Sequence, residues 1–442
     1  MISTKKRVRA VALLASAASI ALVATGCSQG ASGGSSQTSG VTINVVLAVD
    51  PPPASVLDEF TKQTGIKVKW SNIDWDSLQT KIAAAAAAKT YFADATDVDW
   101  SRVGQLGRLG WFYPMENYLD TKSLKTSMPQ ITSFTDAGKV VGIPFDASFT
   151  STTVNKAIFA KAGITTMPTT MDEYTSDLKK IKSEGIVQYP LNIPFAASEG
   201  LSTYWYQATA AFGGTVLDGK GRPQFSNPSS AGYKAAEWMM DALKSGLVAP
   251  ASINVTDSQG MQTLMAKGQA ASTFSDYSGN VGSLYDVPAS SSVVGQVEYI
   301  PTPGVDSVAT NLGNPDGIGI PVNAKYPKAA AKFITWFTSE QSQLDFAGAN
   351  GPDKVISGYA LPSRLSAVEA LTTKGELLGG DTLSSMLKTT VRPVFPQGAP
   401  TWYPDFSRAV NTNLHAAATG DLTVAQAIAA ITAATKKLAA GS

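Results

Sequence analysis

Aromatic side chains stand close to carboxylates, amides and an arginine at several points of the 442-residue sequence. A flat ring can pack against the C–H face of a sugar, while carboxylates, amides and arginine bond its hydroxyl groups. Burying such groups is tolerable only if nearly every hydroxyl finds a partner, so this chemistry needs a polar, aromatic site that can close. We expect about half of the candidates to contact a ligand. They are Asp50, Trp75, Asp99, Trp100, Arg102, Phe145, Asp146, Trp205, Asp276, Tyr277, Asn314, Asp316, Trp402 and Tyr403.

Cysteine and histidine are scarce, and this restricts other kinds of chemistry. The chain holds one Cys, Cys27, and one His, His415, so no internal disulfide can form and a zinc site would consist almost wholly of carboxylates. Catalysis by a Ser–His or Cys–His pair would depend on His415. This residue lies in an Ala-rich stretch, where we expect a surface or hydrogen-bonded side chain. We expect neither a cofactor nor a metal.

Two other interpretations of the candidate residues stay open. Paired carboxylates could act as acid and base in a secreted glycoside hydrolase, although the sequence singles out no pair. The ligand could instead be another solute, such as a polyamine, a phosphate ester or a metal chelate. In addition, Asp50, Asp74 and Asp99 each follow a predicted strand, where an Asp is often a helix N-cap rather than a ligand contact.

Length and composition predict an ordered protein of two domains. A chain of 442 residues exceeds the size at which a single hydrophobic core stops growing. Apolar residues make up 44% of the chain and charged residues 16%, which is too apolar for a disordered protein. The 35 Lys and Arg residues balance 34 Asp and Glu residues, and like charges cluster only from Lys5 to Arg9. A nucleic-acid partner is therefore not expected.

The N-terminus has the pattern of a secretory signal. The basic residues Lys5 to Arg9 precede an apolar run, Val11 to Val23, that is too short to span a bilayer stably. Ala24-Thr25-Gly26-Cys27 resembles the bacterial lipobox, with Ala24 where Leu is usual. We expect residues 1–26 to be a lipoprotein signal peptide and residues 27–40 a Gly/Ser tether. Cys27 would then anchor the protein to the outer face of the cytoplasmic membrane. A plain secretory signal with an incidental Cys is the alternative.

Strands and helices alternate in the first part of the chain. Val41 to Val49 is a near-continuous apolar run, typical of a strand buried on both faces, and Ile66 to Trp70 alternates as a second strand. Ala54 to Thr64 has a helical apolar face and ends before Gly65, which suits a left-handed C-cap. Leu78 to Lys89 predicts a second helix, which Asp74 can cap. The alternation predicts an α/β sheet with crossover helices, and ligands bind beyond the C-terminal strand ends of such sheets.

The stretch from Val140 to Asn155 is expected to carry the chain from one domain into the other. Its β-branched residues suit a buried strand, whereas Gly142 and Pro144 require that strand to bend or to lie at an edge of the sheet. Small and hydroxylated residues follow Asp146, before Asn155 opens a predicted helix. An ordinary strand and loop within a single domain is the alternative.

Three segments resemble, in order, blocks of the bacterial extracellular solute-binding proteins of ABC importers. They are Glu59 to Val68 (EFTKQTGIKV), Ala95 to Leu119 (ATDVDWSRVGQLGRLGWFYPMENYL) and Gly142 to Gly163 (GIPFDASFTSTTVNKAIFAKAG). Within that family they look most like the sugar-binding members that include the maltodextrin binders. Six short motifs recur in that group in the same order: F-x-x-x-T-G-I-x-V, D-V, an aromatic with G-x-L, G-I-P-F, N-K and Pro-Thr-Thr. In this sequence the last of them is Pro168 to Thr170.

The resemblance implies an α/β fold of two lobes, each a mostly parallel sheet flanked by helices, joined by a hinge of two or three strands. Residues 41–146 with 304–344 would form the first lobe, and residues 147–303 with 345–442 the second. Asn311 to Val322 resembles the segment with which the chain of these proteins returns into the first lobe. A third crossing between the lobes is expected near Asp345 to Gly351. In the family an aromatic pair at a helix start faces the ligand, and Trp402 and Tyr403 match it.

The resemblance also implies a function. A monomer would capture a sugar by closing about its hinge and deliver it to the permease subunits of an ABC importer. The ATPases would be separate subunits, because the sequence contains no phosphate-binding loop.

Overall fold

The computed structural model describes residues 38–346 and 361–441. The predicted signal peptide, the lipidation site Cys27 and most of the predicted tether lie outside these residues. None of the described helices combines the length and the apolar character that crossing a bilayer requires.

The first lobe is built on a five-stranded sheet with the strand order β2-β1-β3-β12-β6. β1 pairs in parallel with β2 and with β3, whereas β12 is antiparallel to both of its neighbours, β3 and β6. β12 is therefore the strand of this sheet that runs against the others. The strands are β1 (Thr42–Leu47), β2 (Lys67–Asn72), β3 (Ala95–Asp99), β6 (Ile143–Pro144) and β12 (Asp316–Gly319).

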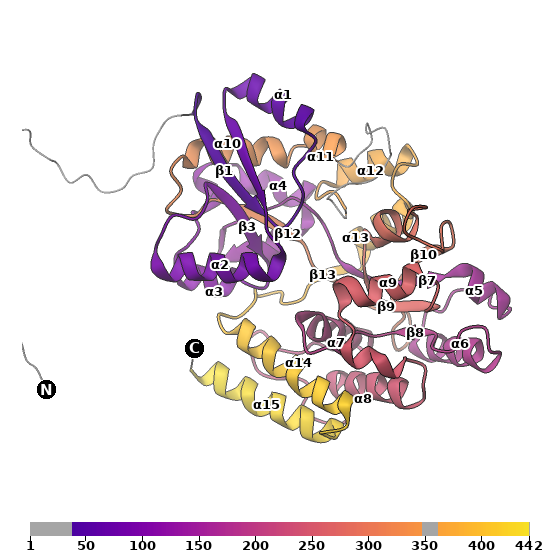
Figure 1. Ribbon diagram of the computed structural model, residues 1–442. Coiled ribbons are helices and arrows are strands. Elements are labelled where there is room, and N and C mark those ends of the chain that lie inside the picture. The colour runs from indigo at the N-terminus through magenta and orange to yellow at the C-terminus, as the bar shows by residue number, and fades with distance from the viewer. Residues whose placement is uncertain (1–37, 347–360, 442) are drawn as a thin grey trace, which may run out of the picture. The chain divides into compact units, whose positions relative to one another are not determined.

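Helices cover both faces of this sheet, because successive side chains of a buried strand point to opposite sides. Leu47 packs in one apolar cluster with Phe60 of α1 and Phe333 of α10, whereas Val46 packs in another with Leu78 of α2. Figure 1 shows these helices on the two sides of β1. The helices of this lobe are α1 (Ala54–Thr64), α2 (Trp75–Ala88), α3 (Val103–Arg108), α4 (Thr121–Ser127), α10 (Pro327–Phe337) and α11 (Glu340–Phe346).

Local signals end and start these helices as predicted. Gly65 follows α1 with a φ of 72°, the left-handed conformation that glycine adopts at little cost. The Asp74 carboxylate accepts a hydrogen bond from the backbone N–H of Ser77 at 3.0 Å and so caps α2. The helix begins at Trp75 rather than at the predicted Leu78, because Asp74 is itself the N-cap.

The second lobe is built on a four-stranded sheet with the order β10-β7-β9-β8. β7 is antiparallel to both β10 and β9, and β8 is parallel to β9, so β7 runs against the others. The strands are β7 (Thr150–Asn155), β8 (Leu191–Asn192), β9 (Ser272–Tyr277) and β10 (Val297–Ile300). The helices are α5 (Lys156–Lys161), α6 (Met171–Ser183), α7 (Glu199–Ala211), α8 (Ala231–Lys244), α9 (Gln262–Ala266), α12 (Leu365–Thr373), α13 (Gly380–Thr389), α14 (Tyr403–Thr419) and α15 (Val424–Ala440).

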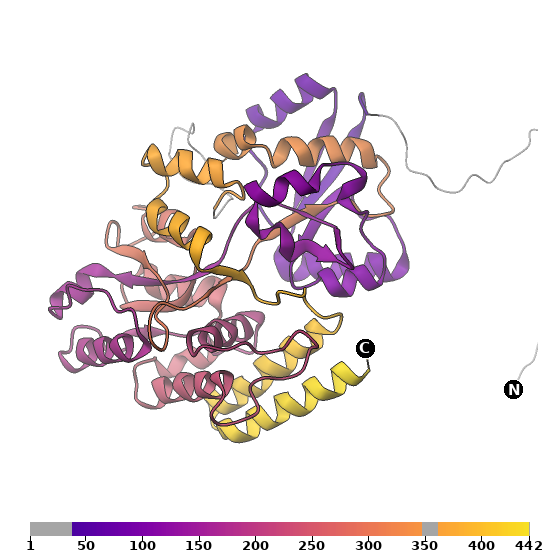
Figure 2. The ribbon, with the colours of Figure 1, turned by 180° about the vertical axis from the view of Figure 1, so that it is seen from behind.

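The last two helices lie side by side, as Figures 1 and 2 show. Phe406 of α14 packs parallel to the ring of Tyr206 on α7, at 5.9 Å between ring centres, which places this helix on the second lobe. Gly420, with a φ of 88°, ends α14, and Thr423 opens α15 with a capping box. Tyr403 is the first residue of α14.

The chain crosses between the lobes at the two reversed strands. β6 of the first sheet is followed by β7 of the second, and β10 of the second sheet is followed, after β11, by β12 of the first. β6 is an edge strand, as Gly142 and Pro144 required. Asn155 caps α5, which confirms the predicted helix start.

Short elements complete the fold. β11 (Asn311–Gly313) pairs in parallel with β13 (Val391–Pro393), and β4 (Thr135–Asp136) pairs with β5 (Lys139–Val140). Most of the third predicted crossing, from residue 347 onwards, lies outside the described residues. The lobe boundaries given above stay a prediction. Short segments of 3-10 or π-helix are formed by Met115–Asn117, Pro129–Phe134, Pro250–Asn254, Asp257–Met261 and Val281–Tyr285.

A matched pair of Leu substitutions tests the core of the first lobe. Leu47 on β1 has no exposed surface, whereas Leu109, after α3, is 45% exposed. Leu47→Ala should lower the free energy of unfolding by about 2–5 kcal/mol, because it removes buried methyl groups and leaves a cavity. Leu109→Ala should change it by less than about 0.5 kcal/mol. Urea unfolding followed by circular dichroism measures both, and equal effects would contradict the assignment of Leu47 to the core.

Candidate functional site

Asp99 ends β3 at the edge of the sheet where ligands are expected. Its Oδ2 accepts from the indole Nε1–H of Trp75 at 2.9 Å. Its Oδ1 accepts from the backbone N–H of Ser101 at 2.8 Å and from the Ser101 hydroxyl. Trp75 comes from the start of α2, and Ser101 lies in the turn that leads into α3. The buried carboxylate therefore fixes one indole and the turn that carries Arg102.

The guanidinium of Arg102 lies between two aromatic rings. Its Cζ is 5.4 Å from the centre of the Trp75 ring, in the first lobe, and 5.8 Å from that of Tyr403, in the second. Cation–π attraction acts at these distances. Nη1 of Arg102 is buried and has no hydrogen-bond partner. A buried polar group without a partner costs about 1–3 kcal/mol, so a ligand oxygen that accepts here would recover free energy.

Glu199, the first residue of α7, brings a negative charge near Arg102 from the second lobe. Its Oε1 accepts from the Tyr403 hydroxyl, and its Oε2 accepts from the Ser407 hydroxyl at 2.7 Å. Burial raises the pKa of Glu199, while the hydrogen bond from Tyr403 and the charge of Arg102 act against this rise. Sequence analysis missed this residue, because the helix dipole alone favours an acidic residue in the first turn of a helix.

Trp100 also links the two lobes. Its Nε1–H donates to the Oδ1 of Asn314 at 2.9 Å, and Asn314 lies between β11 and β12 on the way back into the first lobe. Its ring centre is 5.6 Å from that of Tyr403 and 6.2 Å from that of Phe395. Six predicted residues thus lie together with Glu199. We call Trp75, Asp99, Trp100, Arg102, Glu199, Asn314 and Tyr403 the Arg102 cluster.

Two further tyrosines lie near Glu199. The ring of Tyr206 is 6.5 Å from that of Tyr403, and burial raises the pKa of the Tyr206 hydroxyl. The hydroxyl of Tyr277, a predicted residue, donates to the Oδ2 of Asp257 at 2.7 Å, and burial raises the pKa of Tyr277. Asp257 opens a π-helical turn, a geometry that recurs at functional sites. Tyr206 and Asp257 are candidates that no sequence pattern singled out.

A group of carboxylates lies where β3, β6 and β12 meet. Asp99 and Asp316 stand directly opposite each other on the antiparallel pair β3–β12, and Asp97 shares the face of Asp99. The Oδ1 of Asp146, just after β6, accepts from the backbone N–H groups of Ser148 at 3.1 Å and of Asp316 at 2.9 Å. Burial raises the pKa of Asp146 to about 7. Burial, together with neighbouring carboxylates, also raises the pKa of Asp97 and of Asp316.

Three of these carboxylates favour the protonated form. The raised pKa values mean that Asp97, Asp146 and Asp316 hold protons at a pH at which an unfolded Asp has released its own. In the part of the chain that the structure describes, no three His, Cys, Asp or Glu side chains are arranged to hold a metal ion.

Asp276, another predicted site residue, is fully committed inside the second lobe. Its two carboxylate oxygens accept from the side chains of Thr153, Tyr285 and Asn280 and from the backbone N–H of Tyr277. Four donors leave this carboxylate no acceptor site for a ligand. Asp276 holds β7, β9 and the following turn together.

Three predicted aromatic residues pack elsewhere. Trp205 has no exposed surface, and its Nε1–H donates to the Gly232 carbonyl on α8 at 2.8 Å. Phe145 packs against Phe337 of α10, at 5.8 Å between ring centres. Trp402 packs at right angles against Phe406. Successive side chains at a helix start point about 100° apart, which is why Tyr403 reaches the Arg102 cluster and Trp402 packs away from it.

Two polar residues are engaged outside the Arg102 cluster. Asp50 is exposed after β1 and accepts from the side-chain amide of Asn72 at 2.8 Å. The Nδ1 of His415 lies 2.8 Å from the carbonyl oxygen of Phe195, which confirms that this histidine is hydrogen-bonded.

Known protein sequences show similarity to much of this chain. The family described as bacterial extracellular solute-binding protein matches residues 49–344. A binding protein of Brucella abortus (strain 2308) is 27% identical over 191 residues, which are 42% of this chain and 44% of that protein. A Sinorhizobium fredii protein named "probable amino-acid ABC transporter periplasmic-binding protein" is 25% identical over 309 residues, 65% of each chain. The match thus covers less than half of the length of the Brucella protein.

Solved structures share the fold over nearly the whole chain. Maltose-bound MalE3 of T. maritima matches 90% of this chain and 100% of its own, with a TM-score of 0.74 at 20% identity. The ribitol complex of an ABC transporter solute-binding protein from Agrobacterium radiobacter K84 matches 92% of this chain and 100% of its own, with a TM-score of 0.77 at 22% identity. A chitin oligosaccharide binding protein matches 90% of this chain and 99% of its own, with a TM-score of 0.74 at 20% identity. These structures confirm the predicted two-lobed periplasmic-binding-protein fold.

The raised pKa of Asp146 predicts how stability depends on pH. The pKa is about 7 in the folded protein and about 3.9 in an unfolded chain, so the folded protein binds more protons between these values. The free energy of unfolding should fall as the pH rises from about 5 to 7, by up to about 1.4 kcal/mol per pH unit for each proton, and then level off. Urea unfolding across this range measures the slope.

Two substitutions assign this slope to the buried carboxylates. Asp146→Asn keeps the Oδ1 acceptor but removes the titrating group, so the slope should become flatter. The matched control, Asp58→Asn on the exposed face of α1, should keep the original slope. An unchanged slope in Asp146→Asn would assign the pH dependence to other groups.

Proposed function

Because this chain belongs to the bacterial extracellular solute-binding proteins, we propose that it captures a carbohydrate between its lobes and delivers it to the permease subunits of an ABC importer. The Arg102 cluster supports this proposal most directly. It combines aromatic rings with carboxylate, amide and guanidinium groups, the mixture that a sugar requires.

An unpartnered polar atom supports this place for the ligand. Nη1 of Arg102 is buried without a hydrogen-bond partner, and Arg102 lies close to Tyr403 and Glu199. Buried polar groups in proteins are nearly always paired, so this exception needs an explanation. A ligand hydroxyl group supplies the missing partner here.

The charges favour a neutral ligand. A hydroxyl group can accept from Arg102 and donate to Glu199, so one sugar satisfies both without carrying a charge. The maltose and ribitol bound by two proteins of the same fold support this class. The alternative is a non-sugar solute. The name of the Sinorhizobium relative favours an amino acid, whose carboxylate and ammonium groups would pair with the same two residues.

The residues of the Arg102 cluster come from both lobes, which supports closure of the lobes around a ligand. Trp75 and Arg102 belong to the first lobe, whereas Glu199 and Tyr403 belong to the second. A ligand that bonds both sets favours the state in which they are close, and the strands that cross between the lobes act as the hinge. The lobes comprise residues 41–146 with 304–344 and residues 147–303 with 345–442.

A screen with matched Arg substitutions tests this function. Thermal shift with a library of sugars, polyols and amino acids should reveal a stabilising ligand, and calorimetry then gives its affinity. Arg102→Gln should weaken binding by about 1–3 kcal/mol, or about 5-fold to 150-fold, because a charged hydrogen bond is lost. The variant also loses the cation–π contacts with Trp75 and Tyr403, so its affinity is measured at a temperature at which it is fully folded.

The control is Arg108→Gln, on the exposed end of α3, which should bind like the unmodified protein. Equal affinities of the two variants would remove Arg102 from the site. If only amino acids stabilise the protein, its ligand is an amino acid rather than a sugar. Chromatography of the sugar after incubation should recover it intact, whereas cleavage would show a glycoside hydrolase.

The lipid anchor is part of the proposal. Cys27 is lipidated after removal of residues 1–26, and residues 27–40 tether the protein at the outer face of the cytoplasmic membrane. Cys27→Ser in the full-length precursor should therefore move the protein from the membrane fraction to the medium or the soluble envelope fraction. Ser28→Ala is the control and should stay with the membrane. Membrane association of Cys27→Ser would refute anchoring through this residue.

A further inference from the structure

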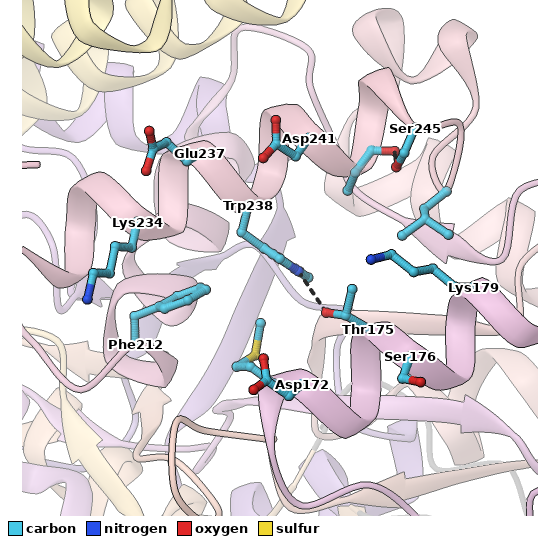
Figure 3. Close-up of a pocket in the computed structure, with 13 residues that line it drawn as sticks. Asp172, Thr175, Ser176, Lys179, Phe212, Lys234, Glu237, Trp238, Asp241 and Ser245 are labelled. Carbon is cyan, nitrogen blue, oxygen red and sulfur yellow. Dashed lines mark hydrogen bonds between the residues drawn. The ribbon is translucent and has the colours of Figure 1, made fainter. Parts of the chain in front are cut away.

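A groove lies between α6 and α8 on the second lobe. Its volume is about 650 Å³, within the range of small-molecule sites. Figure 3 shows Trp238 projecting from α8 toward Thr175 of α6, with Lys234 and Lys179 at opposite ends. Phe212, just after the C-terminus of α7, also lines this groove, whereas Glu199 of the Arg102 cluster is the first residue of α7. The helix separates the two by about 20 Å, so the groove is a different site.

Trp238 provides a fixed aromatic surface in this groove. Its Nε1–H donates to the Oγ1 of Thr175 at 3.2 Å, and its ring centre lies 5.1 Å from that of Phe274 and 6.5 Å from that of Phe212. The side chain is only partly buried. The ring is therefore held from behind and at its polar edge, while part of it stays open to the groove.

Five charged side chains line the groove around this ring. They are Asp172 and Lys179 on α6 and Lys234, Glu237 and Asp241 on α8, and all five are exposed. Within the described residues none of them takes part in an ion pair or a side-chain hydrogen bond. Acceptors and donors are thus available around the indole, and the mixture of both signs favours neither a polyanion nor a polycation.

We propose that this groove binds a neutral carbohydrate, with a sugar ring stacked on Trp238. The C–H face of the sugar packs on the indole, its hydroxyl groups donate to the carboxylates of α8 and Asp172, and they accept from the two lysines. Binding here is independent of the Arg102 cluster and does not require the lobes to close, since all of these residues belong to the second lobe.

Trp238 can report on its own site. In protein labelled with 15N-tryptophan, the Trp238 indole signal is one of eight, and Trp238→Phe identifies it by its disappearance. Maltotriose, cellotriose and chitotriose are added separately up to about 10 mM, so that binding as weak as a Kd of about 1 mM is detected. At least one trisaccharide should shift the Trp238 signal, and the shift should persist in the Arg102→Gln variant.

Two exposed lysines of α8 provide the matched control. Lys234 lines the groove and Lys244 does not. Lys234→Ala should lower the affinity for the trisaccharide by about 3-fold to 10-fold, because one hydrogen bond is lost. Lys244→Ala should leave this affinity unchanged. The proposal is overturned if no trisaccharide moves the Trp238 signal, if the shift vanishes in Arg102→Gln, or if the two lysine variants bind alike. The first outcome would leave the proposed function of the Arg102 cluster untouched.

Discussion

The cation of Arg102 can stay between two rings because each ring is held by a carboxylate. Trp75 covers it from the first lobe and donates to Asp99, and Tyr403 covers it from the second lobe and donates to Glu199. Each carboxylate thus orients a ring, and the charges of Glu199 and Arg102 attract each other. Nη1 of Arg102 keeps no hydrogen-bond partner in this arrangement, so the cluster retains one buried donor that is not satisfied.

The strands that join the lobes carry a different electrostatic constraint. β12 enters the first sheet against its neighbours and places Asp316 opposite Asp99, while Asp146 follows β6 at the other crossing. Burial raises the pKa of Asp146, and burial together with neighbouring carboxylates raises that of Asp316, so both side chains favour the protonated form. Carboxylates that could have looked like ligand groups are tied to the hinge, and the backbone N–H groups that bond Asp146 fix the geometry of both crossings.

The elements of the first lobe could be predicted because their signals are local. An apolar run gave the position of β1, a glycine that tolerates positive φ ended α1, and Asp74 capped α2 through a bond to a residue three positions later. The fold could be predicted because segments such as Gly142 to Gly163 follow a family pattern in order. Glu199, Tyr206 and Asp257 carried no such signal, since an acidic first turn and a tyrosine within a helix are common in any globular protein.

Residue types and their order along the chain determined the fold class, the mixture of rings and acids, and the strand ends at which they occur. The tertiary structure alone decided which of them meet. Asp99 and Asp276 both looked like ligand groups, yet Asp276 is saturated by four donors; Trp402 and Tyr403 are adjacent, yet only Tyr403 reaches Arg102. The physical reason is that ligand contact depends on the partners and directions left after packing, and partners distant in sequence leave no mark on the residues they satisfy.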